Sequence, residues 1–355
     1  MSQFIQLHIL TSFPPANLNR DSLGRPKIAK MGGTDRLRVS SQSLKRTWRT
    51  SDILQSALAN HLGTRTKKLG VEAYKVLVAG GIKDKAAREW AKSIAGVFGK
   101  AKKENEKNPL EEFEIEQLVH VSPAERQAID ELLKTLIEQQ RAPDKEELDL
   151  LRKDNQAVDV ALFGRMLASK PDYNVEAACQ VAHAISVHPV VIEDDYFTAV
   201  DDLNDGSEDA GAAHIGEAGF AAGLFYLYIC INRDLLMENI GGDETLAKKA
   251  IAALIEAAVK VPPQGKQNSF ASRAYASYVL AETGEIQPRS LSVAFLKAID
   301  NRNNKDFGVA AIDSLEQHCE NIDKVYGLSE EIRRYRMNAL SGEGNLKELL
   351  AFVTE

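Results

Sequence analysis

Three basic side chains stand close together in the stretch RVSSQSLKRTWR, which runs from Arg38 to Arg49. The serines before them are typical helix N-caps, so we expect a helix to begin there. At 100° per residue, the three cations share one arc of about 100° beside an apolar seam: Lys45, Arg46 and Arg49. The dipole does not stabilise cations in the first turns of a helix, and the helix alone fits a solvated basic face as well as a track for a polyanion. The basic loop that precedes the helix favours the polyanion.

The charge of the chain is distributed unevenly. The formal net charge is −7, yet residues 1–50 carry nine cations and two acids, which is +7 and leaves −14 for the remainder. The stretch from Ser12 to Gly33 is too rich in Pro and Gly for a helix and too charged for a core strand, so we expect a long basic loop. Neutralising four to six phosphates of a single strand would give a salt slope of about −3 to −4.

Familiar enzyme motifs are absent from the sequence. There is no GxGxxG or HExxH pattern, and Gly265-Lys266-Gln267 lacks the other parts of a phosphate loop. His183 and His188 are five residues apart, which does not place both on one face of a helix. We therefore expect no catalytic residue, no metal site and no cofactor.

One acidic cluster leaves an alternative open. Glu193-Asp194-Asp195 can in principle hold a metal for phosphodiester cleavage, or it can simply be the solvated polar part of a hairpin. Phe197 offers different chemistry, because a base stacked on an aromatic ring gains about 1–3 kcal/mol whatever its identity.

The elements that position these residues follow from periodicity. Phe4–Leu10 alternates as a half-buried strand does, and residues 63–155 are mostly helical, with a capping box that begins at Ser122. We expect a helix over 177–185, and two extended arms over 192–200 and 220–231 joined by a loop of small residues. The second arm has the apolar character of a buried central strand. The order fits an α+β fold of ferredoxin or RNA-recognition-motif type.

Cysteine usage and the lack of long apolar runs indicate the compartment in which the protein works. The three cysteines are far apart in apolar or helical patterns, so they form neither a disulfide framework nor a metal knuckle. No signal peptide and no run of 18 apolar residues is found, so we expect a cytoplasmic protein with no membrane partner.

A series of short segments resembles one family, the CasC-type backbone subunit of the type I-E CRISPR surveillance complex, Cascade. The segments occur in family order along the chain: LNRD at Leu18–Asp21, Gly32-Gly33, RVSSQSLKR at Arg38–Arg46, VDVALFGRM at Val158–Met166, AHAIS at Ala182–Ser186, DDYFTAVDDL at Asp194–Leu203, GKQNSFA at Gly265–Ala271 and PRSLSVAFLKAI at Pro288–Ile299. Individually such segments recur by chance, but the ordered series is specific.

The resemblance implies a non-catalytic, right-hand-like protein that binds CRISPR RNA. Its parts would be an RNA-recognition-motif-like palm over 1–60 and 156–355, helical fingers over 61–155 and a hairpin thumb over 190–222. Copies of the chain would stack head to tail along the CRISPR RNA, other Cascade subunits would be further partners, and thumbs would kink the guide at regular intervals. Target DNA would pair with the bases between kinks, and an effector nuclease would be recruited indirectly.

The resemblance also implies roles for single residues. One set would grip guide phosphates: Arg20, Lys27, Ser40, Gln42, Lys45, Arg46 and Arg49. A second set would sit at the kink: Met166, Phe197 and Thr198. Lys266 and Gln267 are softer candidates for RNA contact. Two alternatives remain, a metal-dependent target-RNA nuclease of a type III-like complex that uses Asp194 or Asp195, and a general single-strand binder.

Overall fold

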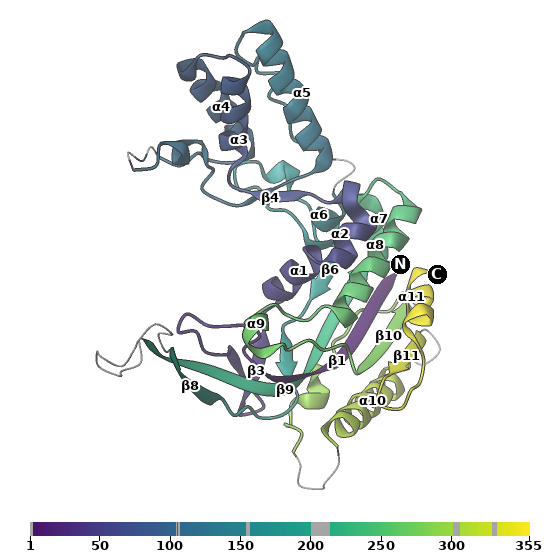
Figure 1. Cartoon of the computed structure of the whole chain (residues 1–355). Coiled ribbons are helices and arrows are strands. Elements are labelled where there is room, and N and C mark those ends of the chain that lie inside the picture. The colour runs from purple at the N-terminus through teal and green to yellow at the C-terminus, as the bar shows by residue number, and fades with distance from the viewer. Residues whose placement is uncertain are drawn as a thin grey trace, which may run out of the picture. The chain divides into compact units, whose positions relative to one another are not determined.

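The computed structural model describes residues 3–103, 105, 107–153, 157–199, 214–300, 306–328 and 332–355. The chain forms two compact units (Figure 1). Unit 1 consists of Met1–Leu54, Gln180–Ile231 and Ile251–Glu355, and unit 2 consists of Gln55–Cys179 and Asn232–Ala250. Strands and helices are both abundant, which confirms the predicted α+β class.

Unit 1 is built on one nine-stranded sheet with the order β11-β10-β1-β9-β7-β3-β2, where β6 and β8 also pair with β9. Its strands are β1 (Phe4–Ala16), β2 (Ile28–Met31), β3 (Thr34–Val39), β6 (Cys179–Val181), β7 (Ala184–Ser186), β8 (Glu193–Ala199), β9 (His214–Asn232), β10 (Tyr278–Gly284) and β11 (Arg333–Asn338). Strand β9 lies between β1 and β7, which confirms the predicted central strand. A hairpin is present, but β8 pairs antiparallel with His214–Phe220, most of which was expected to be loop, and not with the arm predicted over 220–231.

Strand β1 is buried on both faces, so the prediction of a half-buried strand was wrong. Gln6 and His8, which alternation placed on a solvent face, are 2% and 0% exposed. His8 can be buried because its ring nitrogens hydrogen bond to the Tyr226 hydroxyl and the Glu282 carboxylate. The polar residues at alternating positions of β1 therefore do not indicate a face exposed to solvent.

Unit 1 also contains helices, two of which continue into unit 2. They are α1 (Ser41–Arg49), α2 (Asp52–Leu58), α8 (Glu244–Lys260), α9 (Gln267–Phe270), the 3₁₀ turn η4 (Ser292–Phe295), α10 (Phe307–Tyr326) and α11 (Leu346–Thr354), of which α2 and α8 run into unit 2. Ala311, Leu315 and Cys319 of α10 share a buried cluster with Leu10 of β1 and Leu280 of β10. Helix α10 therefore packs against β1 and β10 through this cluster.

Two local predictions were wrong. The helix expected over 177–185 is instead β6 and β7, where Cys179 and Val181 are buried and Gln180 is exposed, since pairing with the sheet outweighs helical spacing. The predicted basic loop contains the end of β1 and all of β2. Gly32 and Gly33 turn the chain from β2 into β3 with φ of 60° and 79°, a conformation that side chains disfavour.

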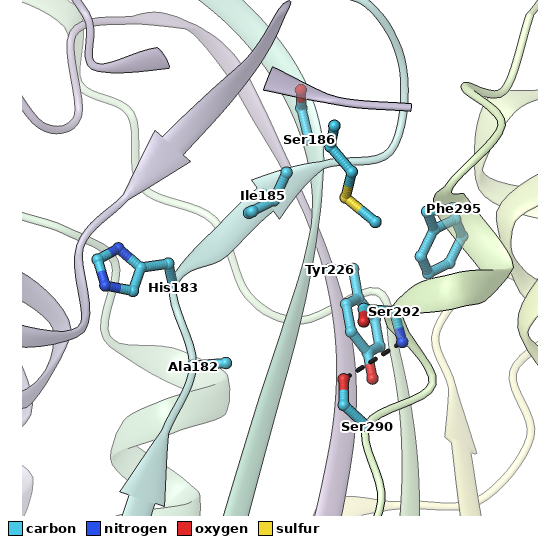
Figure 2. Close-up of a pocket in the computed structure, with 9 residues that line it drawn as sticks. Ala182, His183, Ile185, Ser186, Tyr226, Ser290, Ser292 and Phe295 are labelled. Atoms are coloured by element: carbon cyan, nitrogen blue, oxygen red, sulfur yellow. Dashed lines mark hydrogen bonds between the residues drawn. The ribbon is translucent and has the colours of Figure 1, made fainter. Parts of the chain in front are cut away.

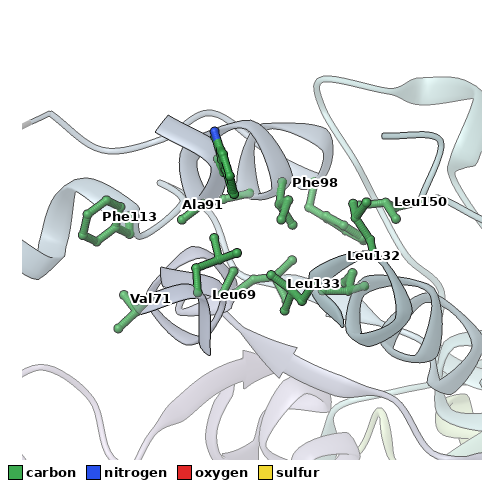
Figure 3. Packing of buried hydrophobic residues seen from close by; sticks show 14 of the residues in the cluster. Leu69, Val71, Ala91, Phe98, Phe113, Leu132, Leu133 and Leu150 are labelled. Carbon is green, nitrogen blue, oxygen red and sulfur yellow. The ribbon is translucent and has the colours of Figure 1, made fainter. Parts of the chain in front are cut away.

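Unit 2 is mainly helical. Its elements are β4 (Thr64–Thr66), α3 (Leu69–Ala79), α4 (Asp84–Phe98), β5 (Val119–Val121), α5 (Pro123–Gln139), α6 (Val158–Phe163) and α7 (Arg233–Asn239). Side chains of α3, α4 and α5 enclose one apolar core, in which Leu69, Phe98 and Leu133 lie close together (Figure 3). The predicted capping box is confirmed, with Ser122 and Glu125 bonded reciprocally at the start of α5. In the described part of the chain, no helix is both long and apolar enough to cross a membrane.

Candidate nucleic-acid interface

Helix α1 begins where the sequence predicts. Ser40 is its N-cap, and the Ser40 hydroxyl accepts a hydrogen bond from the Ser43 N–H at 3.4 Å. Leu44 and Trp48 are buried and form the expected apolar seam. The helix is anchored along this seam, so the basic arc beside it is held in a defined position.

The basic arc lies partly in water. Arg46 is exposed, and Lys45 and Arg49 are half-buried. The expectation that the dipole does not stabilise these cations was wrong, because α1 ends at Arg49 and places Arg46 and Arg49 in its last turn. The Thr50 hydroxyl donates to the Arg46 carbonyl at that end. The helix dipole therefore stabilises Arg46 and Arg49 without a bound ligand.

Two asparagines assemble the surface around α1. The Asn19 side-chain oxygen accepts from the Ser40 N–H at 3.0 Å, and its carbonyl accepts from the Lys27 N–H at 2.8 Å. The Asn17 amide donates to the carbonyls of Gly24 at 2.9 Å and Gly219 at 2.8 Å. The basic loop, the start of α1 and the hairpin arm therefore meet at Asn17–Asn19. Sequence reasoning assigned these asparagines no role, although their place in a broken loop between strands is typical of side chains that bond to backbone.

The nine cations of residues 1–50 do not act alike. Arg20 is exposed beside Pro26. Arg25 donates to the Asp194 carboxylate at 2.9 Å. Arg36 is fully buried, and its guanidinium donates to backbone carbonyls of β7 and η4. The burial lowers the pKa of Arg36. The cationic surface is therefore smaller than the charge count predicts.

Lys27 and Arg38 form a compact positive group beside His183, next to this loop. The Arg38 N–H donates to the Lys27 carbonyl at 2.8 Å, and Arg38 Nη1 lies 2.9 Å from His183 Nδ1. Partial burial lowers the pKa of His183, as do the charges of Arg38 and Lys27. Arg38 and His183 were missed as site residues. Arg38 reaches His183 because β3 pairs with β7, with Arg38 opposite Ile185. The periodicity of the sequence does not predict this pairing.

The loop at 265–271 joins the same surface. Gly265 lies so close to the chain at Leu18 that a Cβ would come within 2.2 Å of the Leu18 carbonyl oxygen. Lys266 begins α9 with a φ of 45° and is half-buried. The Gln267 amide nitrogen donates to the Pro263 carbonyl at 2.7 Å, so that nitrogen stabilises the loop itself.

The hairpin β8–β9 carries Phe197, the ring that is expected from the sequence to stack on a base. Phe197 is 43% exposed and lies opposite Gly216, where a Cβ would come within 2.3 Å of the ring. Thr198 is its neighbour in sequence but points to the other face of the ribbon, because side chains alternate along a strand. Residues 200–213, which include the end of the DDYFTAVDDL segment, lie outside the described residues.

The acidic cluster has the geometry of a solvated strand. Asp194 forms the ion pair with Arg25, and its neighbour Asp195 points to the opposite face of β8. Among the residues that the structure describes, no group of three or more His, Cys, Asp or Glu is placed to hold a metal ion.

Met166 belongs to unit 2 and is 79% exposed. On one side, Arg165 forms a buried ion pair with Glu125, with Nη1 and Oε1 2.8 Å apart. On the other side, Leu167 is buried, and its N–H donates to the Asn174 side chain at 2.7 Å. The two anchored neighbours hold the backbone at Met166 in place and leave its apolar side chain exposed on the surface of unit 2.

Comparison with known proteins agrees with this geometry. The sequence profile of the CT1975-like protein family of Cas proteins matches residues 5–350. The chain belongs to this family. No curated protein sequence matches it.

Two solved structures are similar over nearly the whole chain. A chain of a "CRISPR RNA-guided surveillance complex, pre-nicking" is 29% identical with a TM-score of 0.84, and the match covers 99% of each chain. A chain of a second "CRISPR RNA-guided surveillance complex" is 24% identical with a TM-score of 0.74 and again 99% of each chain covered, which supports the fold alone.

Proposed function

We propose that this Cas protein binds CRISPR RNA as the repeating backbone subunit of a type I-E surveillance complex. The observation that carries the proposal is the end-to-end match to a chain of such a complex, at a TM-score of 0.84 over 99% of both chains. The basic surface that Asn17–Asn19 assembles around α1 supplies the matching chemistry. The further partners are copies of this chain, other Cascade subunits and target DNA paired with the guide.

The proposed grip is on the sugar-phosphate backbone. Arg20, Lys27 and Gln42 flank the basic arc of α1, and all of them belong to unit 1. Lys and Arg contacts to phosphates position a strand but read no sequence. Guide pairing then reads the target, as in other RNA-guided complexes. Ser40 contributes by holding α1 in place, and Lys266 is the stronger candidate in its loop because the Gln267 amide nitrogen is already bonded.

The proposed division of labour follows a right hand. The sheet of unit 1 would be the palm, with 1–60 and 156–355 as its extent, and the helices of 61–155 the fingers. The hairpin within 190–222 would be the thumb that kinks the guide, with Phe197, Thr198 and Met166 at the kink. A ring supported by Gly216 and a methionine fixed by anchored neighbours are apolar surfaces of the kind that displaces a base.

The proposed role is non-catalytic, with cleavage left to a nuclease that the complex recruits. The family is generally non-catalytic. The Arg25–Asp194 ion pair argues against Asp194 as a metal ligand, since that carboxylate already has a cationic partner.

Coexpression of the chain with a CRISPR RNA and the other Cascade subunits tests the proposal. We expect the purified particle to contain RNA of one guide length and several copies of this chain. Heterogeneous cellular RNA would contradict the proposal and favour a general single-strand binder. Incubation with complementary target RNA and Mg²⁺ should leave that RNA intact, whereas regular cleavage abolished by Asp194→Ala would establish the nuclease alternative.

A further inference from the structure

A cavity of about 220 Å³ lies in unit 1, apart from the residues assigned to phosphate binding. It is bounded by β7, by β9, by Met31 of the β2–β3 hairpin and by the chain at 290–295 (Figure 2). Two segments that carry the family resemblance, AHAIS and PRSLSVAFLKAI, thus meet at one site with no function assigned.

The cavity has a rigid frame. The buried Arg36 guanidinium donates to the Ser186 carbonyl at 3.0 Å and to the Phe295 carbonyl at 3.1 Å, so one side chain joins three of its walls. Gly32 lies against the chain at Leu296, where a Cβ would come within 1.6 Å of the carbonyl oxygen. These contacts fix the spacing of the walls, as a preformed binding site requires.

The walls offer flat apolar surfaces. The rings of Tyr226 and Phe295 have centroids 5.2 Å apart and lie on one side of the cavity, with Ile185 across from them (Figure 2). The Tyr226 ring is held in place because its hydroxyl hydrogen bonds to His8 and accepts from the Leu291 N–H at 3.0 Å. Tyr226 is 5% and Phe295 2% exposed, so the two packed rings form a closed apolar wall against which one flat ring system could lie.

Polar groups line the remainder. Ser290, Ser292 and His183 border the cavity, and the Ser292 N–H donates to the Ser290 hydroxyl at 3.2 Å (Figure 2). An arginine can only donate, so Nδ1 of His183 accepts from Arg38, and the proton of the neutral imidazole is on Nε2. The wall of the cavity therefore presents the hydroxyls of Ser290 and Ser292, which can both donate and accept and suit the edge of a heterocycle.

We propose that this cavity receives one nucleobase of the bound RNA strand. The inference rests on the proposed function and adds to it a site for a base beside the sites for phosphates. Lys27 and Arg38 next to His183 provide positive charge for the phosphate attached to that base. The volume lies below the roughly 300–1,000 Å³ of pockets for drug-sized ligands, which fits a single ring system. An apolar side chain of a second copy would make no use of the serine hydroxyls or of the positive charge of Lys27 and Arg38, so a base is the better occupant.

Site-specific crosslinking in the assembled RNA complex tests the proposal. Guides would carry one 4-thiouridine each, at successive positions, and crosslinked peptides would be identified by mass spectrometry after irradiation. We expect crosslinks to the peptides of Tyr226 or Phe295 from only some guide positions, at a regular spacing. Ser292→Phe, which fills the cavity, should reduce their yield at least tenfold. Val293→Phe is the matched control, since Val293 is 58% exposed on the same turn and does not line the cavity, and it should retain the crosslinks.

The outcomes separate this inference from the proposed function. RNA bound at guide length without crosslinks to these peptides, or with crosslinks that Ser292→Phe leaves unchanged, would overturn the base site alone. Loss of contact between copies in Ser292→Phe, with guide binding and base crosslinking elsewhere intact, would identify the cavity as a protein-binding site and would also overturn it. Absence of guide RNA from the purified particle would instead contradict the proposed function.

Discussion

Unit 1 holds two groups of charged side chains that differ in their surroundings. The basic arc of α1 lies at the surface, with Arg46 in water. The second group surrounds Glu282, which is fully buried and accepts from Arg334 at 2.7 Å, Arg289 at 2.9 Å and His8 at 3.2 Å. Asp323 of α10 pairs with the same two arginines. Arginine therefore serves the fold in one region and remains accessible to a ligand in the other.

Arg36, which lies close to α1 in the sequence, shows the same difference between a structural and an accessible arginine. By sequence it belongs to the basic stretch, but by environment it belongs with the Glu282 group, because it is buried and bonded to carbonyls. Removing a buried charge partner costs far more stability than removing a solvated cation. This difference can be measured in single variants.

Glu282→Ala should have the largest effect on stability. It leaves Arg289 and Arg334 inside the fold without their shared carboxylate, and we expect unfolding in urea to lose about 3–5 kcal/mol. Glu320→Ala, an exposed acid on α10, is the control and should change the free energy by less than about 0.5 kcal/mol. Equal effects of the two substitutions would show that the network does not stabilise the fold.

Arg36→Met and Arg46→Met compare the two kinds of arginine directly. Arg36→Met leaves buried carbonyls of Ser186 and Phe295 without a donor, so we expect a loss of about 2–4 kcal/mol in urea unfolding. Arg46→Met should alter stability by less than about 0.5 kcal/mol and weaken RNA binding instead. A stable Arg36→Met protein with weakened RNA binding would reverse the assignment.

Ser40→Ala should have an intermediate effect. It removes the hydroxyl that accepts the Ser43 N–H and should lower the free energy of unfolding by about 1 kcal/mol. Ser40→Asp keeps an acceptor at the cap and should retain most of the stability in the same thermal or urea measurement. If Ser40→Ala is as stable as the unchanged protein, α1 is held by its apolar seam alone.

His8 should give the smallest effect, seen in pH dependence. Burial lowers the pKa of His8 from 6.5 in the fold, so the unfolded chain binds its proton first, and stability falls as pH drops below about 6.5. The slope from one such group cannot exceed about 1.4 kcal/mol per pH unit. Urea midpoints at pH 7.5 and 5.5 should differ less in His8→Gln than in His61→Gln, an exposed control. Identical pH dependence in both variants would mean that His8 does not contribute.

Local chemistry made part of this molecule predictable. The cap at Ser40 and the capping box at Ser122 follow from neighbouring residues, and both are confirmed. A hairpin was also predicted, although its second arm begins inside the expected loop. The burial of Arg36 depends on carbonyls of Ser186 and Phe295, 150 and 259 residues away, so no local pattern gives it. The same holds for His183, whose partner Arg38 reaches it only through the sheet.

The salt dependence of RNA binding in Lys45→Ala/Arg49→Ala tests the central claim most directly. If these cations face guide phosphates, the double variant should bind all sequences about equally less tightly, and its slope of log K against log salt should be shallower by about 1.4. Lys324→Ala/Lys347→Ala, two exposed cations on α10 and α11, is the matched control and should keep the original slope. An unchanged slope in Lys45→Ala/Arg49→Ala would contradict the account.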